Sequence, residues 1–214
     1  MTHFRTAAIA AFALASLLPA QDDGPTHVIV THRVYPEKRA PFRNDLAGQI
    51  QRLAHWRDDG AIAGLQILTT ALIDDEAWEA LVIAKTGTRG VELWKRVDQL
   101  NGVASTTTVP VDLTESGGDA DAPAQTGVFL VIPYECGTPM RVAPLVDSSL
   151  KEGTLLGFRY FVPRFAGGRS WNVLLVLHYP DWLTLGRRAT TAWRDNQSAC
   201  REKLAVIAEA TLTK

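Results

Sequence analysis

The sequence predicts an α+β protein made of two similar halves whose sheets pack against each other. The first observation is a pattern that recurs at one offset, since Gly60, Gly64 and Trp78 reappear 93 residues later as Gly153, Gly157 and Trp171. The second is that a strand-like run follows each glycine pair and another follows each tryptophan. The third is that these runs are apolar on both faces, so the face without helices must also be buried. Together they indicate an internal duplication.

The first twenty residues have the order of a secretory signal peptide. Arg5 supplies a positive charge, residues 7–18 form an apolar run, and Ala20 precedes the polar Gln21. An apolar run of about 12 residues is shorter than the roughly 20 that a membrane span needs. We therefore expect cleavage after Ala20, a soluble periplasmic or secreted protein, and no stable membrane insertion afterwards. An uncleaved anchor helix is the alternative.

Residues 27–113 contain the elements of the first half. The β-branched, alternating residues 27–35 predict a strand. Apolar residues at three- and four-residue steps then predict an amphipathic helix, which Gly60 ends in the left-handed conformation; they are Phe42, Leu46, Ile50 and Leu53. Strands are expected at about 61–72 and 78–85, a second helix at about 88–100, and a closing strand at about 103–113.

Residues 114–127 are rich in Gly, Asp, Ala and Pro, which predicts a linker, and residues 128–214 form the second half. Its first helix is expected to be shortened, because Pro139 and Pro144 interrupt the segment. Strands follow at Gly157 and Trp171, then a helix from about Asp181. Residues 206–212 are interpreted as a fourth strand, with the end of a long helix as the alternative.

Each half thus has the order strand, helix, strand, strand, helix, strand, which is the ferredoxin-like split β-α-β unit. In this order over about residues 27–214, and in the Gly and Trp repeat, the chain resembles the dimeric α+β barrel superfamily in a tandem-fused form. The resemblance implies an α+β fold of two ferredoxin-like β-α-β-β-α-β repeats packed sheet to sheet as a pseudo-dimeric α+β barrel. It also implies a ligand held between helices and sheet or inside the barrel, in a monomer or a homodimer.

Four polar residues on apolar strands are the candidate ligand-binding residues: Arg159, Glu79, His178 and Gln66. Gln66 matches Arg159 at the offset of 93, and Glu79 matches Asn172. Alternation along the strands places these polar residues on one face, which is the candidate cavity. The opposite face, with Trp78 and Trp171, is expected to lie under the helices.

A buried guanidinium needs a partner, and Glu79 from the other half is the expected partner of Arg159. Arg159 would then clamp an anionic or carbonyl group of a ligand. The alternatives are a structural ion pair or an arginine that reaches solvent at the barrel mouth. His178 is expected to act as a general base or, alternatively, to cap a strand end at the surface.

Other site classes receive little support from the sequence. Cys136 and Cys200 form a disulfide or stay unpaired, and the sequence does not decide between the two. His27 and His32 are five residues apart and face opposite ways on a strand, so we expect no metal site and no cofactor. A net charge of -1 without a basic run argues against a nucleic-acid partner.

The sequence identifies no catalytic residue. We expect an exported, soluble α+β-barrel protein that binds a small, partly apolar molecule in the barrel cavity. One alternative is a non-enzymatic envelope scaffold, or partner-docking protein, with no ligand. A second is a haem-handling protein, for which His55 is the candidate ligand on a predicted helix.

Overall fold

The computed structural model describes residues 26–71, 78–87, 104–119, 127–138, 140–165, 171–188 and 200–213. The elements in chain order are β1 (His27–Arg33), the short 3-10 helix η1 (Pro36–Lys38), α1 (Arg39–Asp58), β2 (Ile62–Thr70), β3 (Ala80–Thr86), β4 (Ser105–Gly118), β5 (Val128–Cys136), α3 (Ala143–Lys151), β6 (Gly157–Pro163), β7 (Val173–Tyr179), α4 (Trp182–Arg188), β8 (Cys200–Glu202) and β9 (Val206–Thr213). The predicted signal segment 1–20 and the predicted helix at 88–100 lie outside the described residues.

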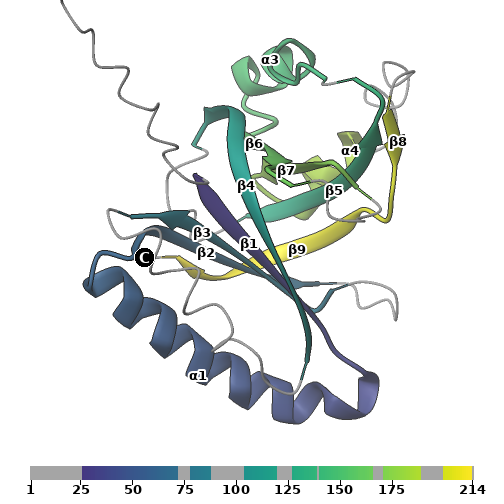
Figure 1. Ribbon diagram of the computed structural model, residues 1–214. Helices are drawn as coiled ribbons and strands as arrows, with labels where there is room; N and C mark the ends of the chain where they lie inside the picture. The colour runs from purple at the N-terminus through teal and green to yellow at the C-terminus, as the bar shows by residue number, and fades with distance from the viewer. Residues whose placement is uncertain are drawn as a thin grey trace, which may run out of the picture.

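Eight strands form a closed antiparallel barrel (Figure 1). Their order is β7-β6-β4-β1-β3-β2-β9-β5, and pairing of β5 with β7 completes the ring. β8 pairs with the last residues of β5, from Tyr134 to Cys136. The first four strands have the order β4-β1-β3-β2, and the last four barrel strands have the corresponding order β9-β5-β7-β6.

Two long-range strand pairings join the halves. β4 pairs with β1 through Ser105–Val111 and then with β6 through Val111–Gly118, with an irregularity between Leu113 and Glu115. β9 pairs with β5 and, further along, with β2. β4 therefore extends five residues past the predicted end at residue 113, into the segment that composition predicts to be a linker. The expected strand at 206–212 is confirmed as β9.

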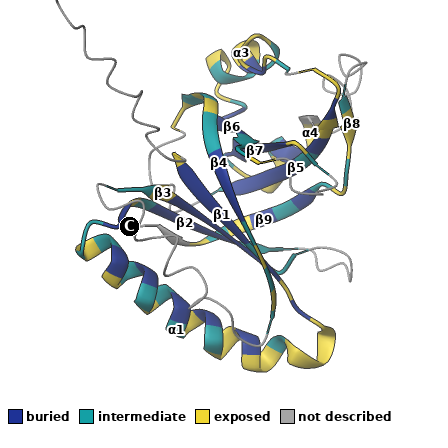
Figure 2. Ribbon diagram, in the orientation of Figure 1, coloured by how far each residue is buried: buried dark blue, intermediate teal, exposed yellow. Residues whose placement is uncertain are grey.

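Helices cover the outside of the barrel. α1 lies along one side, and α3 and α4 lie by the second half (Figure 1). The inward face of α1 is buried (Figure 2), and its Leu53 and Trp56 pack against Val30 and Val82. The second half packs Val146 of α3 and Leu185 of α4 with strand residues such as Leu175. Burying these apolar stripes is the main stabilising term for such layers.

The inside of the barrel is a separate apolar cluster that takes side chains from all eight strands. Its buried members are Ile29, Leu68, Leu81, Ile83, Val109, Val111, Phe129, Val131, Phe161, Leu174, Val176 and Ala208. The expectation that the inner faces of the two halves meet is therefore confirmed. Trp78 and Trp171 pack against this inner cluster and not under the helices as predicted. They precede β3 and β7, so the alternation of strand residues does not apply to them.

The glycines that follow α1 and α3 have left-handed backbone conformations. Gly60, just after α1, has φ of 81°, and Gly153, just after α3, has φ of 69°. Both values lie in the left-handed region that glycine adopts without steric cost, which confirms the prediction for Gly60. Cys136 and Cys200 form a disulfide, with 4.0 Å between their Cα atoms. Among the described helices, none is long and apolar enough to cross a membrane.

Candidate functional site

A cavity of about 410 Å³ lies between α1 and the neighbouring strands β2 and β9. Its lining consists of Phe42, Arg43, Leu46, Ala47, Ile50, Thr69, Thr70, Glu79 and Thr211. The volume falls within the range of small-molecule pockets, which are mostly apolar with a few placed polar groups. The cavity is on the outer, helix-covered face of the sheet, whereas the predicted cavity is inside the barrel.

The helix supplies the apolar wall of this cavity. Phe42, Leu46 and Ile50 are spaced by four residues, so they form one stripe of α1 that faces the sheet. Ala47 lies beside this stripe, and its small side chain leaves room next to the strands. On the strand side the hydroxyls of Thr69 and Thr211 are 2.6 Å apart and hydrogen-bond to each other.

Glu79 is the charged residue that is best fixed at the cavity. Its carboxylate accepts a hydrogen bond of 3.2 Å from Nε of Arg39 at the start of α1, and only 11% of its side chain is exposed. The backbone N–H of Glu79 donates to the carbonyl of His32, and its own carbonyl accepts from the N–H of Thr70. The carboxylate is thus held on the strand framework, where it can accept a hydrogen bond from a ligand.

Arg159 and Gln66 lie inside the barrel and contact each other. The guanidinium of Arg159 on β6 donates to Oε1 of Gln66 on β2, and β6 and β2 are opposite strands of the barrel. Both side chains are buried, and Arg159 also lies over the ring of Phe161 at 5.8 Å. The expected pairing of Arg159 with Glu79 is replaced by Arg159 with Gln66, because Glu79 is paired with Arg39 next to the cavity outside.

His178 is also an interior residue. Its ring is buried and stacks on the ring of Phe129, with the centroids 4.4 Å apart. The alternative of a surface strand cap is therefore wrong, because the strand end that carries His178 is covered. Of the four predicted residues, the structure brings Arg159 to Gln66, places His178 on Phe129, and puts Glu79 at the cavity.

The histidines of β1 face opposite ways, as expected from alternation. His27 makes an edge contact with Phe161 at 5.2 Å inside the barrel, and His32 lies 5.6 Å from Phe42 beneath α1. Burial is the main cause that lowers the pKa of His32 to about 4, and the charge of Asp45 opposes it. Nδ1 of His32 hydrogen-bonds to the hydroxyl of Thr106 at 3.2 Å. His32 is thus a neutral histidine in the wall behind Phe42.

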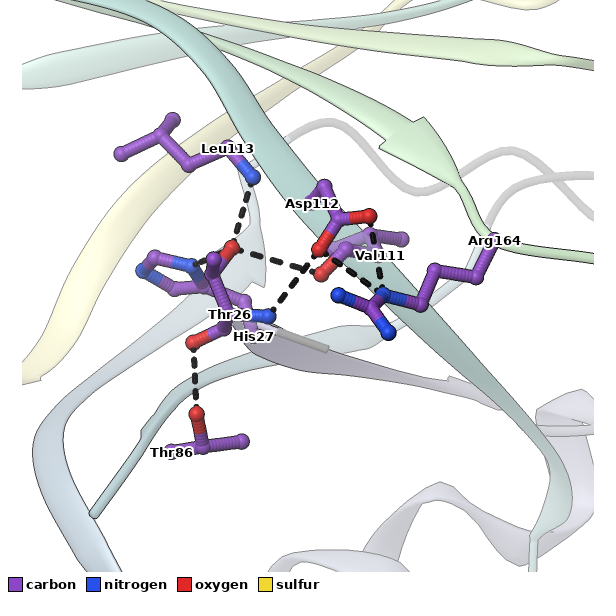
Figure 3. Close-up of polar contacts among 7 residues, drawn as sticks. All are labelled: Thr26, His27, Thr86, Val111, Asp112, Leu113 and Arg164. Atoms are coloured by element: carbon purple, nitrogen blue, oxygen red, sulfur yellow. Dashed lines mark hydrogen bonds and ion pairs between the residues drawn. The ribbon is translucent and has the colours of Figure 1, made fainter. Parts of the chain in front are cut away.

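A polar cluster around Thr26 fixes the start of β1 (Figure 3). The Thr26 hydroxyl accepts a 2.7 Å hydrogen bond from the N–H of Leu113, and the Thr86 hydroxyl donates to the Thr26 carbonyl at 3.0 Å. Asp112 accepts from the N–H of Thr26 and from Nε of Arg164 at 2.9 Å. The contacts tie β1, β4 and the end of β6 together, so we assign this cluster a structural role.

The residues that the sequence did not indicate are Arg39, Thr69 and Thr211. Arg39 is one of several arginines of the chain, and only the path of α1 over the sheet brings it to Glu79. Thr211 enters because β9 pairs with β2, a contact between segments far apart in the chain. The apolar wall could be predicted from the sequence, because the spacing of Phe42, Leu46 and Ile50 places them on one side of the helix. Among the described residues, no group of three His, Cys, Asp or Glu side chains could hold a metal ion.

Neither a family model nor a curated protein matches the sequence, whereas several solved structures share its fold. An anthrone oxidase-like protein has a TM-score of 0.54 at 12% identity, with 91% of this chain and 94% of that chain covered. A candidate chlorite dismutase has a TM-score of 0.55 at 12% identity, covering 87% and 94%. A haem-binding protein from Thermus thermophilus has a TM-score of 0.51 at 12% identity, covering 87% and 91%.

These structures have the dimeric α+β barrel fold, and the closed eight-stranded barrel of this chain agrees with it. The names that they carry differ from one another. At 12% identity the likeness concerns the fold, and one fold hosts many activities. The function of this chain must therefore be argued from its own cavity.

Proposed function

We propose that this chain binds a small, partly apolar molecule in the cavity beneath α1, with Glu79 orienting the ligand. The observation that carries the proposal is a mostly buried carboxylate, held by Arg39, in a cavity of about 410 Å³ with an apolar helix wall. A placed charge in an apolar pocket is typical of ligand sites. The fold neighbours support it in a general way, since one of them is a haem-binding protein.

The lining defines the kind of ligand that fits. An apolar body would pack against Phe42, Leu46 and Ile50, and a hydroxyl or amine of the ligand would donate to Glu79. Arg43 is exposed and lines the same cavity, so it provides a cation near the opening. The site offers no described nucleophile with an adjacent base, so we propose binding and assign no reaction.

Native mass spectrometry of the purified, cleaved protein tests this proposal. We expect a retained small molecule, or binding of naphthol as a probe with an apolar body and one hydroxyl. The Glu79→Gln variant should weaken binding about tenfold, because the ligand then donates to a neutral amide oxygen in place of a charged carboxylate. Glu202→Gln, at an exposed position on β8, is the matched control and should bind like the unchanged protein. Equal binding by the Glu79 variant would remove this carboxylate from the site.

Export to the periplasm or the medium is part of the same proposal. Support comes from the signal-like order of residues 1–20 and from the disulfide between Cys136 and Cys200. Disulfides persist in oxidising compartments and are rare in the cytosol. N-terminal sequencing of the secreted product should give Gln21 as the first residue, and an intact Met1 in the cytosol would exclude export.

We also propose that the halves are two copies of one ferredoxin-like unit. Support comes from the common strand order, from left-handed glycines at 60 and 153, and from the recurring tryptophans at 78 and 171. On this proposal the closed barrel is a pseudo-dimer within one chain. A measured molecular mass in solution then decides between a monomer and a homodimer of such pseudo-dimers.

Haem handling is the second candidate function, and it is favoured by the name of one fold neighbour, a haem-binding protein. The residues that line the cavity beneath α1 do not fit a haem. Among the described residues no histidine lines this cavity, and His55 is exposed on α1 beyond the lining residues. Titration with haem should therefore give no Soret shift. A Soret shift that His55→Ala abolishes would instead support haem binding through His55. A scaffold without any ligand is the third candidate, and a protein that retains no molecule and binds no probe would favour it.

A further inference from the structure

A second cavity, of about 340 Å³, lies in the other half of the barrel at the ends of β6 and β7. The described residues that line it are Cys136, Gly137, Thr138, Tyr160, Val162, Pro163, Arg164, Phe165, Trp171, Asn172 and Val173. We call it the aromatic cavity, because Tyr160, Phe165 and Trp171 form part of its wall. It shares no lining residue with the cavity beneath α1.

The strand sides of the two cavities correspond in part, whereas the α1 wall of the first has no counterpart in the described lining of the second. Three strand-end positions of the first cavity have counterparts in the second at the offset of 93: Thr69, Thr70 and Glu79 correspond to Val162, Pro163 and Asn172. Both sets lie at the end of the second strand and just before the third strand of their half. Each half therefore has a cavity beside the end of its second strand.

The polar chemistry of the two cavities differs. Where the first has the Glu79 carboxylate, the second has Asn172, whose side chain is bonded to the backbone of Cys136. Oδ1 of Asn172 accepts from the N–H of Cys136 at 2.8 Å, and Nδ2 donates to the Cys136 carbonyl at 2.7 Å. Asn172 thus forms with Cys136, at the end of β5, the two hydrogen bonds that a neighbouring strand would form. Its amide is neutral, so it adds no charge to the aromatic cavity.

Arg164 is the charged residue in the lining, and an acid neutralises it. Its Nε donates to both carboxylate oxygens of Asp112, at 3.0 and 2.9 Å (Figure 3). The pair fixes the guanidinium on β4, and 22% of the Arg164 side chain is exposed. Among the described lining residues the charge is therefore largely compensated, which disfavours a strongly charged ligand. In the first cavity only Oε2 of Glu79 is bonded to Arg39, so the compensation there is less complete.

Tyr160 supplies the hydrogen-bond donor. Its side chain is buried, and its hydroxyl oxygen accepts from the backbone N–H of Met140 at 3.2 Å, a bond that does not use the hydroxyl hydrogen. Burial is the main cause that raises the pKa of Tyr160 above its usual value, so the hydroxyl stays protonated at neutral pH. Phe165, which is 65% exposed, and Trp171 give flat apolar surfaces beside it.

We propose that the aromatic cavity is a second binding site, for a flat, uncharged aromatic molecule with a carbonyl oxygen that accepts from Tyr160. This goes beyond the proposed function, which concerns the Glu79 cavity and a ligand that donates. The chain then carries two sites with opposite hydrogen-bond preference. One accepts through a carboxylate, and the other donates through a phenol.

Acetylnaphthalene is the probe for the aromatic cavity, because its ketone accepts and cannot donate. Isothermal titration calorimetry should give a Kd below about 1 mM. Tyr160→Phe should raise this Kd about three- to tenfold, and Trp171→Ala should raise it further. Glu79→Gln should leave it unchanged, because that residue lines the other cavity. Binding that Glu79→Gln abolishes, or that Tyr160 and Trp171 do not affect, would overturn the second site, as would no binding at all.

An NMR measurement keeps the test valid if the Tyr160 variant is destabilised through its bond to Met140. The Trp171 indole N–H resonance is identified as the one that Trp171→Phe removes. It should shift on addition of acetylnaphthalene to the unchanged full chain and should not respond to naphthol in the same way. A Trp171 resonance that does not move at saturating probe contradicts the proposal. The dependence of naphthol binding on Glu79 is measured in a separate experiment. Failure of one proposed site therefore does not decide the test of the other.

Discussion

Arg159 and Gln66 reach each other across the inside of the barrel, and they are 93 residues apart in the chain. This is the offset at which the Gly and Trp pattern recurs, so the contact joins two positions that the pattern relates. A side chain and its counterpart can meet in this way when both point toward a common axis. The pair is therefore a direct structural sign that the inner faces of the two halves enclose one interior.

The interior pair predicts a specific stability effect. Gln66→Ala removes an acceptor from a buried guanidinium and should lower the free energy of unfolding by about 2 kcal/mol. Gln51→Ala, at an exposed position of α1, is the control and should change it by less than about 0.5 kcal/mol. Urea unfolding followed by circular dichroism measures both. Equal stability of the two variants would mean that the hydrogen bond contributes nothing.

His32 predicts a dependence of stability on pH. Its pKa is about 4 in the folded chain and 6.5 in the reference state, so between these values only the unfolded chain takes up the proton. The neutral His32 makes its full contribution to the free energy of unfolding above pH 6.5. As the pH falls from 6.5 toward 4, this free energy decreases by about 3 kcal/mol in total. Urea unfolding of His32→Leu from pH 4 to 7.5 should show a flatter profile than the unchanged protein. Parallel profiles would contradict the assignment.

Replacement by alanine should have opposite effects on stability at Gly153 and Gly186. A Cβ at Gly153 would meet no atom within 4 Å, so the cost of Gly153→Ala comes from its φ of 69° and should be about 1 kcal/mol. Gly186 in α4 is equally open and lies in a helix, so Gly186→Ala should stabilise by up to about 1 kcal/mol. Thermal unfolding compares them. A Gly153→Ala protein as stable as Gly186→Ala would exclude left-handed geometry at Gly153.

The disulfide predicts how the chain responds to reduction. Its cysteines are 64 residues apart, and closing a loop of that length in the unfolded chain is worth about 4 kcal/mol in the chain-entropy model. Replacing Cys136 and Cys200 by serine, or adding a reductant, should therefore lower the melting temperature. Thiol titration of the native protein should find no free thiol. Two reactive thiols before reduction would contradict the bond.

Much of the fold could be predicted because local patterns determine it. The α1 stripe of Phe42, Leu46, Ile50 and Leu53 and the left-handed Gly60 are properties of adjacent residues. The alternation that separates His27 from His32 is also local. The meeting of the two inner faces followed from a physical argument, because apolar strand faces without helices must be buried.

The site could be predicted only in part. Glu79 was selected because it is a polar residue on an apolar strand, but its partner depends on how α1 crosses the sheet, which periodicity does not specify. The extension of β4 to Gly118 was missed because its last residues are polar and glycine-rich, and pairing with β6 overrides their weak strand propensity. Thr211 reaches the cavity through long-range pairing of β9 with β2.

The central claim is that the cavity beneath α1 holds a small molecule, and filling it is the most direct test. Ala47 lines the cavity from an exposed position of α1, so Ala47→Trp should occupy the space without disturbing the core. Native mass spectrometry in the presence of naphthol should show the bound probe on the unchanged protein and none on Ala47→Trp, with equal melting temperatures. Equal occupancy on both proteins would contradict the account.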